Sequence, residues 1–256
     1  MAMSAVRERT LRVCALYPDL MNIYADRGNL FVLERRCAWR GIGFELGGSS
    51  LGDPLDGAGH DLYYIGGGQD RDQRLCAADL HEHKRAALHE AAERGAAVLG
   101  VCGGYQLLGT SYVLDGDTLA GVGLLPARTV REPGPRLIGN VAIQVSLNGA
   151  GIDGPRVLAG FENHGGRTYL EPSATPLGRV LKGHGNDGRS RCEGARAGNV
   201  IGTYLHGPLL PKNAWFADWL IATALGIQMN ELAPLDDELE QRAHESARRA
   251  AGIATA

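Results

Sequence analysis

The fold is decided by an apolar run that ends at a cysteine among glycines: Ala96-Ala97-Val98-Leu99-Gly100-Val101-Cys102-Gly103-Gly104-Tyr105-Gln106-Leu107-Leu108. The run before Cys102 has the length of a buried strand, and the residues after it fit a helix. Glycines are needed where a sharp strand-to-helix turn leaves no room for neighbouring Cβ atoms. We therefore predict a strand–turn–helix unit with the thiol of Cys102 at the turn.

A reactive side chain at such a turn has the layout of a nucleophile elbow. Serine hydrolases carry G-x-S-x-G at the elbow, where this chain has Gly100-Val101-Cys102-Gly103-Gly104. The N–H groups and the positive dipole end of the following helix are expected to favour the thiolate, which is the nucleophilic form. The alternative is a buried cysteine that only ends a core strand, but the flanking glycines favour a nucleophile.

Composition limits the classes of protein to consider. Of 256 residues, 44% are hydrophobic and 21% charged, so the chain can bury a sizeable core. The formal net charge of -3 gives no reason to expect nucleic acid or an anionic membrane as the main partner. Five widely spaced cysteines without a C-x-x-C pair argue against disulfides and a zinc site. No apolar run approaches the ~18 residues that cross a bilayer. We expect a cytoplasmic protein without a metal.

Strands and helices alternate along the first half of the chain. We expect strands over 11–17, 42–46, 61–65 and 96–101, and helices from Asp26 to Gly41, over 75–94 and from Gly104. This alternation predicts an α/β fold, a mostly parallel central sheet with helices on both faces. In such sheets, ligands bind at the carboxyl ends of strands. The glycines that follow Ile65 and the thiol that follows Val101 should therefore meet at one edge.

The second half is richer in strands. We expect a strand over 136–145, a strand leading into a polar loop within each of 160–167 and 199–208, and then a helix over 215–225. We count one domain over residues 1–256, with its core from about residue 10 to 226 and a charged C-terminal tail over 227–256. For the charged stretch 236–250 the alternatives are a solvated helix, disorder, or a helix that docks a partner.

A cysteine nucleophile needs a base within hydrogen-bond reach. Six of the eight histidines lie on a charged helix or in polar or flexible contexts. The two candidates that remain are His164 in Glu162-Asn163-His164-Gly165 and His206 in Tyr204-Leu205-His206-Gly207-Pro208. We favour His206, because it ends a strand where the other strand-end groups gather.

Acyl chemistry also needs backbone N–H donors for the oxygen of a tetrahedral intermediate. Gly103, directly after the nucleophile, can supply one donor, and Gly67 or Gly68 the other. A triple glycine alone could be a phosphate-cradling or tight turn. The nearby nucleophile elbow favours the interpretation of the triple glycine as a source of an oxyanion donor.

These stretches together resemble a known family. The sequences Gly100-Val101-Cys102-Gly103-Gly104-Tyr105-Gln106, Gly66-Gly67-Gly68 and Tyr204-Leu205-His206-Gly207 are similar to those of class I glutamine amidotransferases of the cobyric-acid-synthase-like branch. Within that branch, three further stretches resemble the GatD family, the glutaminase subunits of lipid II isoglutaminyl synthase. They are Asn22-Ile23-Tyr24-Ala25-Asp26-Arg27-Gly28-Asn29, Ile65-Gly66-Gly67-Gly68-Gln69-Asp70 and Gly160-Phe161-Glu162-Asn163-His164. The resemblance extends to about residue 225 and implies a flavodoxin-like three-layer sandwich.

The resemblance implies a role for each site residue. Cys102 attacks the side-chain amide of L-glutamine, a glutamyl thioester forms, ammonia leaves, and water releases glutamate. His206 activates the thiol and then the water. Arg136 matches the position of the arginine that holds the substrate, with a plain surface arginine as the alternative. Gln106 lines the pocket, or else caps or packs.

The chain departs from the wider class at Pro208, because most members carry a carboxylate two residues after the histidine. Either the site works as a dyad, or the carboxylate comes from elsewhere. We hypothesise that a partner protein supplies it, which would keep glutamine hydrolysis low until the partner docks.

The acceptor chemistry is expected on another polypeptide. The chain has no G-x-x-x-x-G-K-[ST] loop and starts almost directly at its first strand, so no ATP-binding domain fits beside the glutaminase. The resemblance implies a heterodimer with a Mur-ligase-like synthetase of the MurT type that holds ATP and Mg²⁺. That partner amidates the D-glutamate of lipid II to D-isoglutamine in peptidoglycan synthesis. This chain then needs no cofactor and no membrane insertion, although the acceptor is lipid-linked.

Three other functions stay open at this point. The chain could serve another ATP-dependent amidation of the cobyric-acid type. It could be a DJ-1/PfpI-like cysteine hydrolase, whose elbow would not require Arg136 or the Tyr-Leu-His-Gly stretch. It could also be a non-catalytic glutamine-binding regulator.

Overall fold

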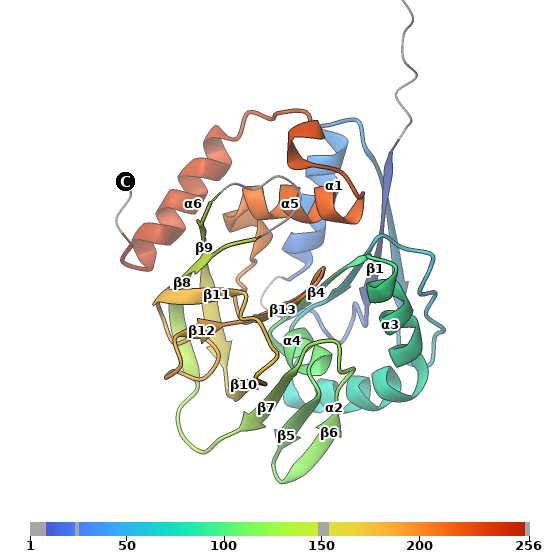
Figure 1. The fold of residues 1–256 in the computed structure, drawn as a ribbon, viewed down its shortest axis with the longest axis vertical. Helices are drawn as coiled ribbons and strands as arrows, with labels where there is room; N and C mark the ends of the chain where they lie inside the picture. Colours follow the sequence, from blue (N-terminus) through green and yellow to red (C-terminus); the bar gives the residue numbers. More distant parts are fainter. Residues whose placement is uncertain (1–8, 24–25, 148–153, 254–256) are drawn as a thin grey trace, which may run out of the picture.

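The computed structural model describes residues 9–23, 26–147 and 154–253. Its centre is a six-stranded sheet in the order β13-β14-β4-β3-β1-β2 (Figure 1). All neighbouring strands in this sheet are parallel except β13, which pairs antiparallel with β14. The strands are β1 Thr10–Leu16, β2 Gly43–Ser49, β3 Leu62–Ile65, β4 Ala97–Val101, β13 Ala195–Ala197 and β14 Val200–Thr203. The predicted α/β fold with a mostly parallel central sheet is confirmed.

The central strands are buried on both faces, as parallel strands covered by helices should be. Every residue of β3, β4 and β14 is buried. In Figure 1, α1 and α5 lie together on one side of the sheet, and α2, α3 and α4 lie on the other. The helices are α1 Arg27–Ala38, α2 Asp70–Asp79, α3 Arg85–Glu93, α4 Gly103–Leu108, α5 Ala214–Ala224 and α6 Glu238–Ala250, with short turns η1 Leu80–Lys84, η2 Leu210–Lys212 and η3 Met229–Glu231.

Two predicted helices differ in detail from the structure. The helix expected over 75–94 begins earlier, at Asp70, and the π-helical turn η1 divides it into α2 and α3. The charged segment at the C-terminus forms α6, which packs on α5, β8 and β9, so disorder is wrong for residues 238–250. Helix α1 begins as predicted but ends at Ala38, three residues before the predicted Gly41, which takes a left-handed backbone (φ 67°) in the turn that follows.

The strand-rich second half forms two further four-stranded sheets, which the sequence did not predict. One has the order β10-β7-β5-β6 and the other β12-β11-β8-β9 (Figure 1). Their strands are β5 Ser111–Leu114, β6 Asp117–Ala120, β7 Ala127–Arg131, β8 Leu137–Val145, β9 Arg156–His164, β10 Gly166–Leu170, β11 Gly178–Lys182 and β12 Cys192–Glu193. Phe161 and His206 exchange backbone hydrogen bonds of 3.0 and 2.9 Å, which join β9 to the segment that follows β14.

Candidate active site

Cys102 lies at a strained turn between β4 and α4. Its backbone has φ 53° and ψ −105°, a conformation that side chains other than glycine rarely adopt. Neighbouring strand ends hold it there: the Cys102 N–H donates to the Thr203 carbonyl (2.8 Å), and the Gly104 N–H donates to the Gly66 carbonyl (3.0 Å). Backbone strain of this kind persists only where the surroundings fix it, and it is common at catalytic residues. The predicted nucleophile elbow is present.

The glycines of the elbow are required because a side chain at these positions would clash with neighbouring atoms. A Cβ on Gly104 would lie 2.2 Å from the Ile65 carbonyl oxygen, and one on Gly100 would lie 2.6 Å from a Leu108 methyl carbon. Both separations are shorter than real Cβ contacts, so larger residues would push α4 away from the sheet. The sequence predicted this requirement correctly.

A cavity of about 440 Å³ opens at the carboxyl ends of the parallel strands, and Cys102 lies in its wall. Three of the other predicted site residues line the same cavity: Gly68, Gln106 and Arg136. The remaining lining residues are Ile23, Gln69, Asp70, Arg71, Gln73, Tyr112, His164 and Gly165. The fold therefore brings residues far apart in the sequence to one polar, water-accessible site.

Arg136 immediately precedes β8 and is one of two exposed arginines in the cavity wall, with Arg71. Its Nε donates to Asn163 Oδ1 and its Nη2 to the Asn163 carbonyl, both at 2.7 Å. The third nitrogen of the guanidinium, Nη1, has no hydrogen-bond acceptor among the described residues. A guanidinium fixed in this way can bind the carboxylate of an amino acid.

Two buried glutamines also face the cavity. Gln106 donates from Nε2 to the Tyr204 hydroxyl (3.2 Å), and Gln73 donates from Nε2 to the Gly68 carbonyl (3.0 Å). Their Oε1 atoms are buried and have no hydrogen-bond partner among the described residues, so each can accept a hydrogen bond from a ligand. Gln73 was not identified from the sequence. The only sequence signal for it is that α2 begins close after the extended glycines at 66–68, which we call the glycine strand, so that the first turn of α2 lies next to Gly68.

The backbone donors expected for an oxyanion lie beside Cys102. A Cβ on Gly103 would lie 2.9 Å from the Gly68 nitrogen, so these two residues lie side by side at the elbow. Gly67 also lies beside the nucleophile, since a Cβ on it would lie 3.4 Å from Cys102 Cβ. However, its N–H donates to Asp26 Oδ2 at 2.7 Å. Of the two alternatives that the sequence left open, Gly68 is the one whose amide faces Gly103.

The two candidate bases occupy different places. His206 follows β14, the strand beside that of Cys102, and is completely buried (0% exposed) rather than in the cavity wall. Burial lowers the pKa of His206 to about 4, with His164, Lys212 and Arg136 adding to the effect. His164 lines the cavity with its ring stacked on Tyr204 at 3.5 Å, and its Nδ1 is 2.8 Å from the Gly166 carbonyl. His164 therefore lies in the site, and His206 is buried near its lining residues His164 and Arg136.

Buried carboxylates near these histidines are engaged elsewhere. Glu162 Oε1 and Oε2 accept from the backbone N–H groups of His184 (2.6 Å) and Gly185 (2.9 Å), and Oε2 is 3.8 Å from His164 Nε2. Glu193 accepts from Thr203 and from the Tyr204 N–H. Burial raises the pKa of Glu193 to about 8.

The thiol of Cys102 is not activated in this conformation. Burial raises its pKa to about 12, and the nearby Asp26 carboxylate adds to the rise. Arg136 and the Gly103 N–H lower the pKa, as the sequence predicted for the helix start, but they do not offset burial. The helix start therefore acts in the predicted direction, but burial outweighs it.

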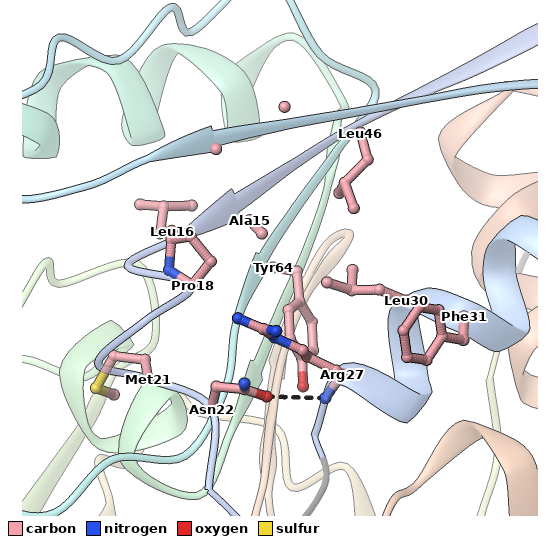
Figure 2. Close-up of a pocket in the computed structure, with 12 residues that line it drawn as sticks. Ala15, Leu16, Pro18, Met21, Asn22, Arg27, Leu30, Phe31, Leu46 and Tyr64 are labelled. Atoms are coloured by element: carbon pink, nitrogen blue, oxygen red, sulfur yellow. Dashed lines mark hydrogen bonds between the residues drawn. The ribbon is translucent and has the colours of Figure 1, made fainter.

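A second cavity, of about 380 Å³, is lined by residues of β1, β2 and α1 and of the segment that follows β1 (Figure 2). Its walls are mostly apolar and include Leu30, Leu46 and Tyr64. Met21 lines it as well, and a Cβ on Gly68 would lie 2.3 Å from Met21 Sδ. The segment with Met21 therefore separates this cavity from the glycine strand of the first one.

Neither a metal site nor a membrane span is found in the described residues. Over 9–23, 26–147 and 154–253, no three His, Cys, Asp or Glu side chains are grouped closely enough to hold a metal ion. None of the helices in those ranges combines the length and the apolar character needed to cross a membrane.

Comparison with known proteins agrees with this geometry. Residues 12–214 match the model of the CobB/CobQ-like glutamine amidotransferase domain. The chain belongs to this family. It is 37% identical to GatD of Streptococcus pneumoniae over 84% of this chain and 80% of that one, and 38% identical to GatD of Staphylococcus aureus over 88% and 89%. Both are described as subunits of lipid II isoglutaminyl synthase (glutamine-hydrolyzing).

More distant relatives share part of their length or only the fold. Cobyric acid synthase of Variovorax paradoxus is 34% identical over 78% of this chain but only 39% of its own. Among solved structures, PurLQS of Thermotoga maritima has a TM-score of 0.58 at 23% identity, covering 84% of this chain and 95% of that one. A glutamine amidotransferase of the same organism has a TM-score of 0.52 at 19% identity, covering 93% and 94%. These two structures support the fold alone.

Proposed function

We propose that this chain is the glutaminase subunit of a lipid II isoglutaminyl synthase. It hydrolyses L-glutamine and supplies ammonia to a Mur-ligase-like partner, which amidates the D-glutamate of lipid II to D-isoglutamine. The observation that carries the proposal is the elbow: Cys102 lies at a strained turn in the wall of one cavity with Arg136 and Gly68, beside the Gly103 amide. The GatD relatives, similar over most of both chains, support the choice of substrate and pathway.

The cavity suits the two ends of glutamine. Arg136 binds the α-carboxylate through the edge of its guanidinium that Asn163 leaves free. The acceptor Oε1 atoms of Gln73 and Gln106 are available to donors such as the α-ammonium group. The side-chain amide then reaches Cys102.

The first half-reaction forms a thioester. The sulfur of Cys102 attacks the amide carbon while the thiol proton passes to His206. The carbonyl oxygen gains negative charge and accepts hydrogen bonds from the Gly68 and Gly103 amides. When the C–N bond breaks, His206 returns the proton to the leaving ammonia. In the second half-reaction, His206 takes a proton from water, the hydroxide attacks the thioester, and glutamate leaves as the thiol is restored.

The partner completes the system. Formation of an amide from a carboxylate and ammonia requires activation of the carboxylate, which we assign to ATP and Mg²⁺ on a MurT-type subunit in a cytoplasmic heterodimer. Pro208 stands where other class I members carry an acid, so we also assign the orienting carboxylate of His206 to that subunit.

The test is reconstitution with the MurT-type protein of the same organism. The complex should release glutamate from L-glutamine and amidate lipid II, with the product identified by mass spectrometry. Cys102→Ala should abolish amidation from glutamine while complex formation and amidation from added ammonium salt persist. No glutamate release from the wild-type complex would refute the proposal. Equal hydrolysis by the isolated chain and the complex would refute the partner-supplied carboxylate.

A further inference from the structure

The segment Asn22–Asn29 contains one acidic side chain with an unusual environment. Asp26 directly precedes α1, is 1% exposed, and accepts a hydrogen bond from the Gly67 N–H at 2.7 Å through Oδ2. Its Oδ1 is buried without a hydrogen-bond partner among the described residues. Burying a charged carboxylate that has only one uncharged hydrogen-bond donor is energetically unfavourable. Burial accordingly raises the pKa of Asp26 to about 7. Such a cost indicates a function for the group.

The glycine strand is held so that its successive amides face opposite ways. The Gly66 carbonyl accepts from Gly104 on α4, so the N–H of the same trans peptide, that of Gly67, points away from α4 and meets Asp26. The Gly67 carbonyl accepts from the Ile23 N–H at 3.1 Å, so the Gly68 N–H points away from Ile23. It faces Gly103 instead.

We propose that Asp26 is a positioning residue that selects the oxyanion donor: by holding the Gly67 N–H, it fixes the glycine strand with the Gly68 N–H aimed at the reacting oxygen. The inference rests on the proposed glutaminase function. In an extended strand only alternate amides face the same side, so Gly67 and Gly68 cannot both serve. Rotation of these peptide units would exchange the two amides, and the Asp26 hydrogen bond opposes it.

The negative charge of Asp26 does not activate the Cys102 thiol. Titratable groups that face it are Cys102 and, from β3, Tyr64, and its carboxylate raises the pKa of both. A group that acted on the sulfur directly would lower the thiol pKa. The contact therefore opposes ionisation of the nucleophile while it organises the amides around it.

Kinetics of the reconstituted complex distinguish this role from a structural one. Asp26→Ala should lower kcat for glutamine about 10²-fold, the usual effect of losing one oxyanion donor, with KM little changed. Alkylation of Cys102 by iodoacetamide forms no oxyanion, so its rate should not fall. Asp26→Asn keeps an acceptor for Gly67 and should restore kcat to within about fivefold of wild type. Asn29→Ala removes buried hydrogen bonds on the same helix, to Tyr64 and Leu210, and serves as the stability control.

Nuclear magnetic resonance tests the contact independently of turnover. Protein labelled with ¹³C′,¹⁵N-glycine gives filtered signals only from glycine amides preceded by glycine, which are Gly48, Gly67, Gly68, Gly104 and Gly166. The Gly67 signal should titrate with Asp26 in the wild type and not in Asp26→Asn. After reaction with 6-diazo-5-oxo-L-norleucine, which leaves a ketone on the cysteine, the Gly68 signal should shift more than that of Gly67.

The outcomes separate the two proposals. Asp26→Ala with wild-type kcat, Asp26→Asn as impaired as Asp26→Ala, or a ketone that shifts Gly67 rather than Gly68 would each overturn the role of Asp26. A parallel loss of kcat in Asn29→Ala at equal thermal stability would also overturn it. Absence of both turnover and the Cys102 adduct would refute the glutaminase function, and the pH titration of Gly67 would still decide whether Asp26 holds that amide.

Discussion

Replacement of Arg136 by glutamine is the most direct perturbation of substrate binding. Asn163 already occupies Nε and Nη2, at 2.7 Å each, so the guanidinium is fixed before substrate arrives. A charge-assisted hydrogen bond contributes about 1.5–3 kcal/mol, which corresponds to a factor of roughly 10–150 in affinity. We expect Arg136→Gln to raise KM for glutamine by that factor. Its kcat should change less, because the side chain does not contact the reacting amide.

The assay pairs the variant with a modified substrate. Glutamate or ammonia release is measured on the reconstituted complex with L-glutamine and with its α-amide, which lacks the carboxylate but keeps the side-chain amide. The wild type should discriminate against the α-amide by about the same factor as the variant loses, and Arg136→Gln should discriminate little. Arg136→Lys keeps the charge but not the planar fork, so an intermediate KM is expected.

One result would refute the reasoning. If Arg136→Gln retained both a wild-type KM and full discrimination against the α-amide, Arg136 would not bind the carboxylate. The anchor would then lie elsewhere in the cavity, for which Arg71 is the other lining cation.

Three further predictions follow from the site and from the packing behind it. His206→Ala should lower kcat by about 10²–10⁴, as expected for loss of a general base, whereas His164→Ala should act mainly on KM; the reverse order would transfer the role of base to His164. In a Cys192→Ser background, which removes the one cysteine that is not buried, iodoacetamide should modify Cys102 slowly at neutral pH and faster as the pH rises. The reason is that the pKa of the Cys102 thiol is raised to about 12. Rapid alkylation of Cys102 at pH 7, measured by peptide mass mapping, would contradict this. Arg36, 1% exposed, pairs with Asp218 and Asp237, so Arg36→Met should cost about 3–5 kcal/mol and lower Tm by roughly 10 °C in calorimetry; an unchanged Tm would show that the pair adds nothing.

The parts of the fold that follow local rules could be predicted from the sequence. The apolar run, the glycines and the helical pattern around Cys102 specify the elbow, because the constraints act between residues within one turn of each other. The alternation of strands and helices specifies a parallel sheet, and the carboxyl-end rule then brings Gly68 and Cys102 together. Arg136 and Gln106 came from a family resemblance, since nothing in their own neighbourhood marks them.

The rest depends on contacts between distant segments. Asp26 meets Gly67 across 41 positions, and this contact decides which amide is directed away from the cavity. The raised pKa of Cys102 depends on burial by the whole fold, which the helix start alone could not reveal. The sequence favours His206 over His164 as the base, and only the structure shows that His164 lines the cavity whereas His206 is completely buried.

The electrostatics of the two reacting groups determine how the site must work. Burial raises the pKa of the Cys102 thiol to about 12 and lowers that of His206 to about 4, so both are neutral near pH 7. These directions disfavour a preformed thiolate–imidazolium pair, so in the proposed mechanism the proton leaves the sulfur as the sulfur attacks. The charge that develops moves at once onto the amide oxygen, where the Gly68 and Gly103 amides are already in place. In the proposed mechanism, placement of the amide donors therefore matters more for the rate than a reactive sulfur at rest. For this reason, the side chains that fix the glycine strand have a direct influence on catalysis.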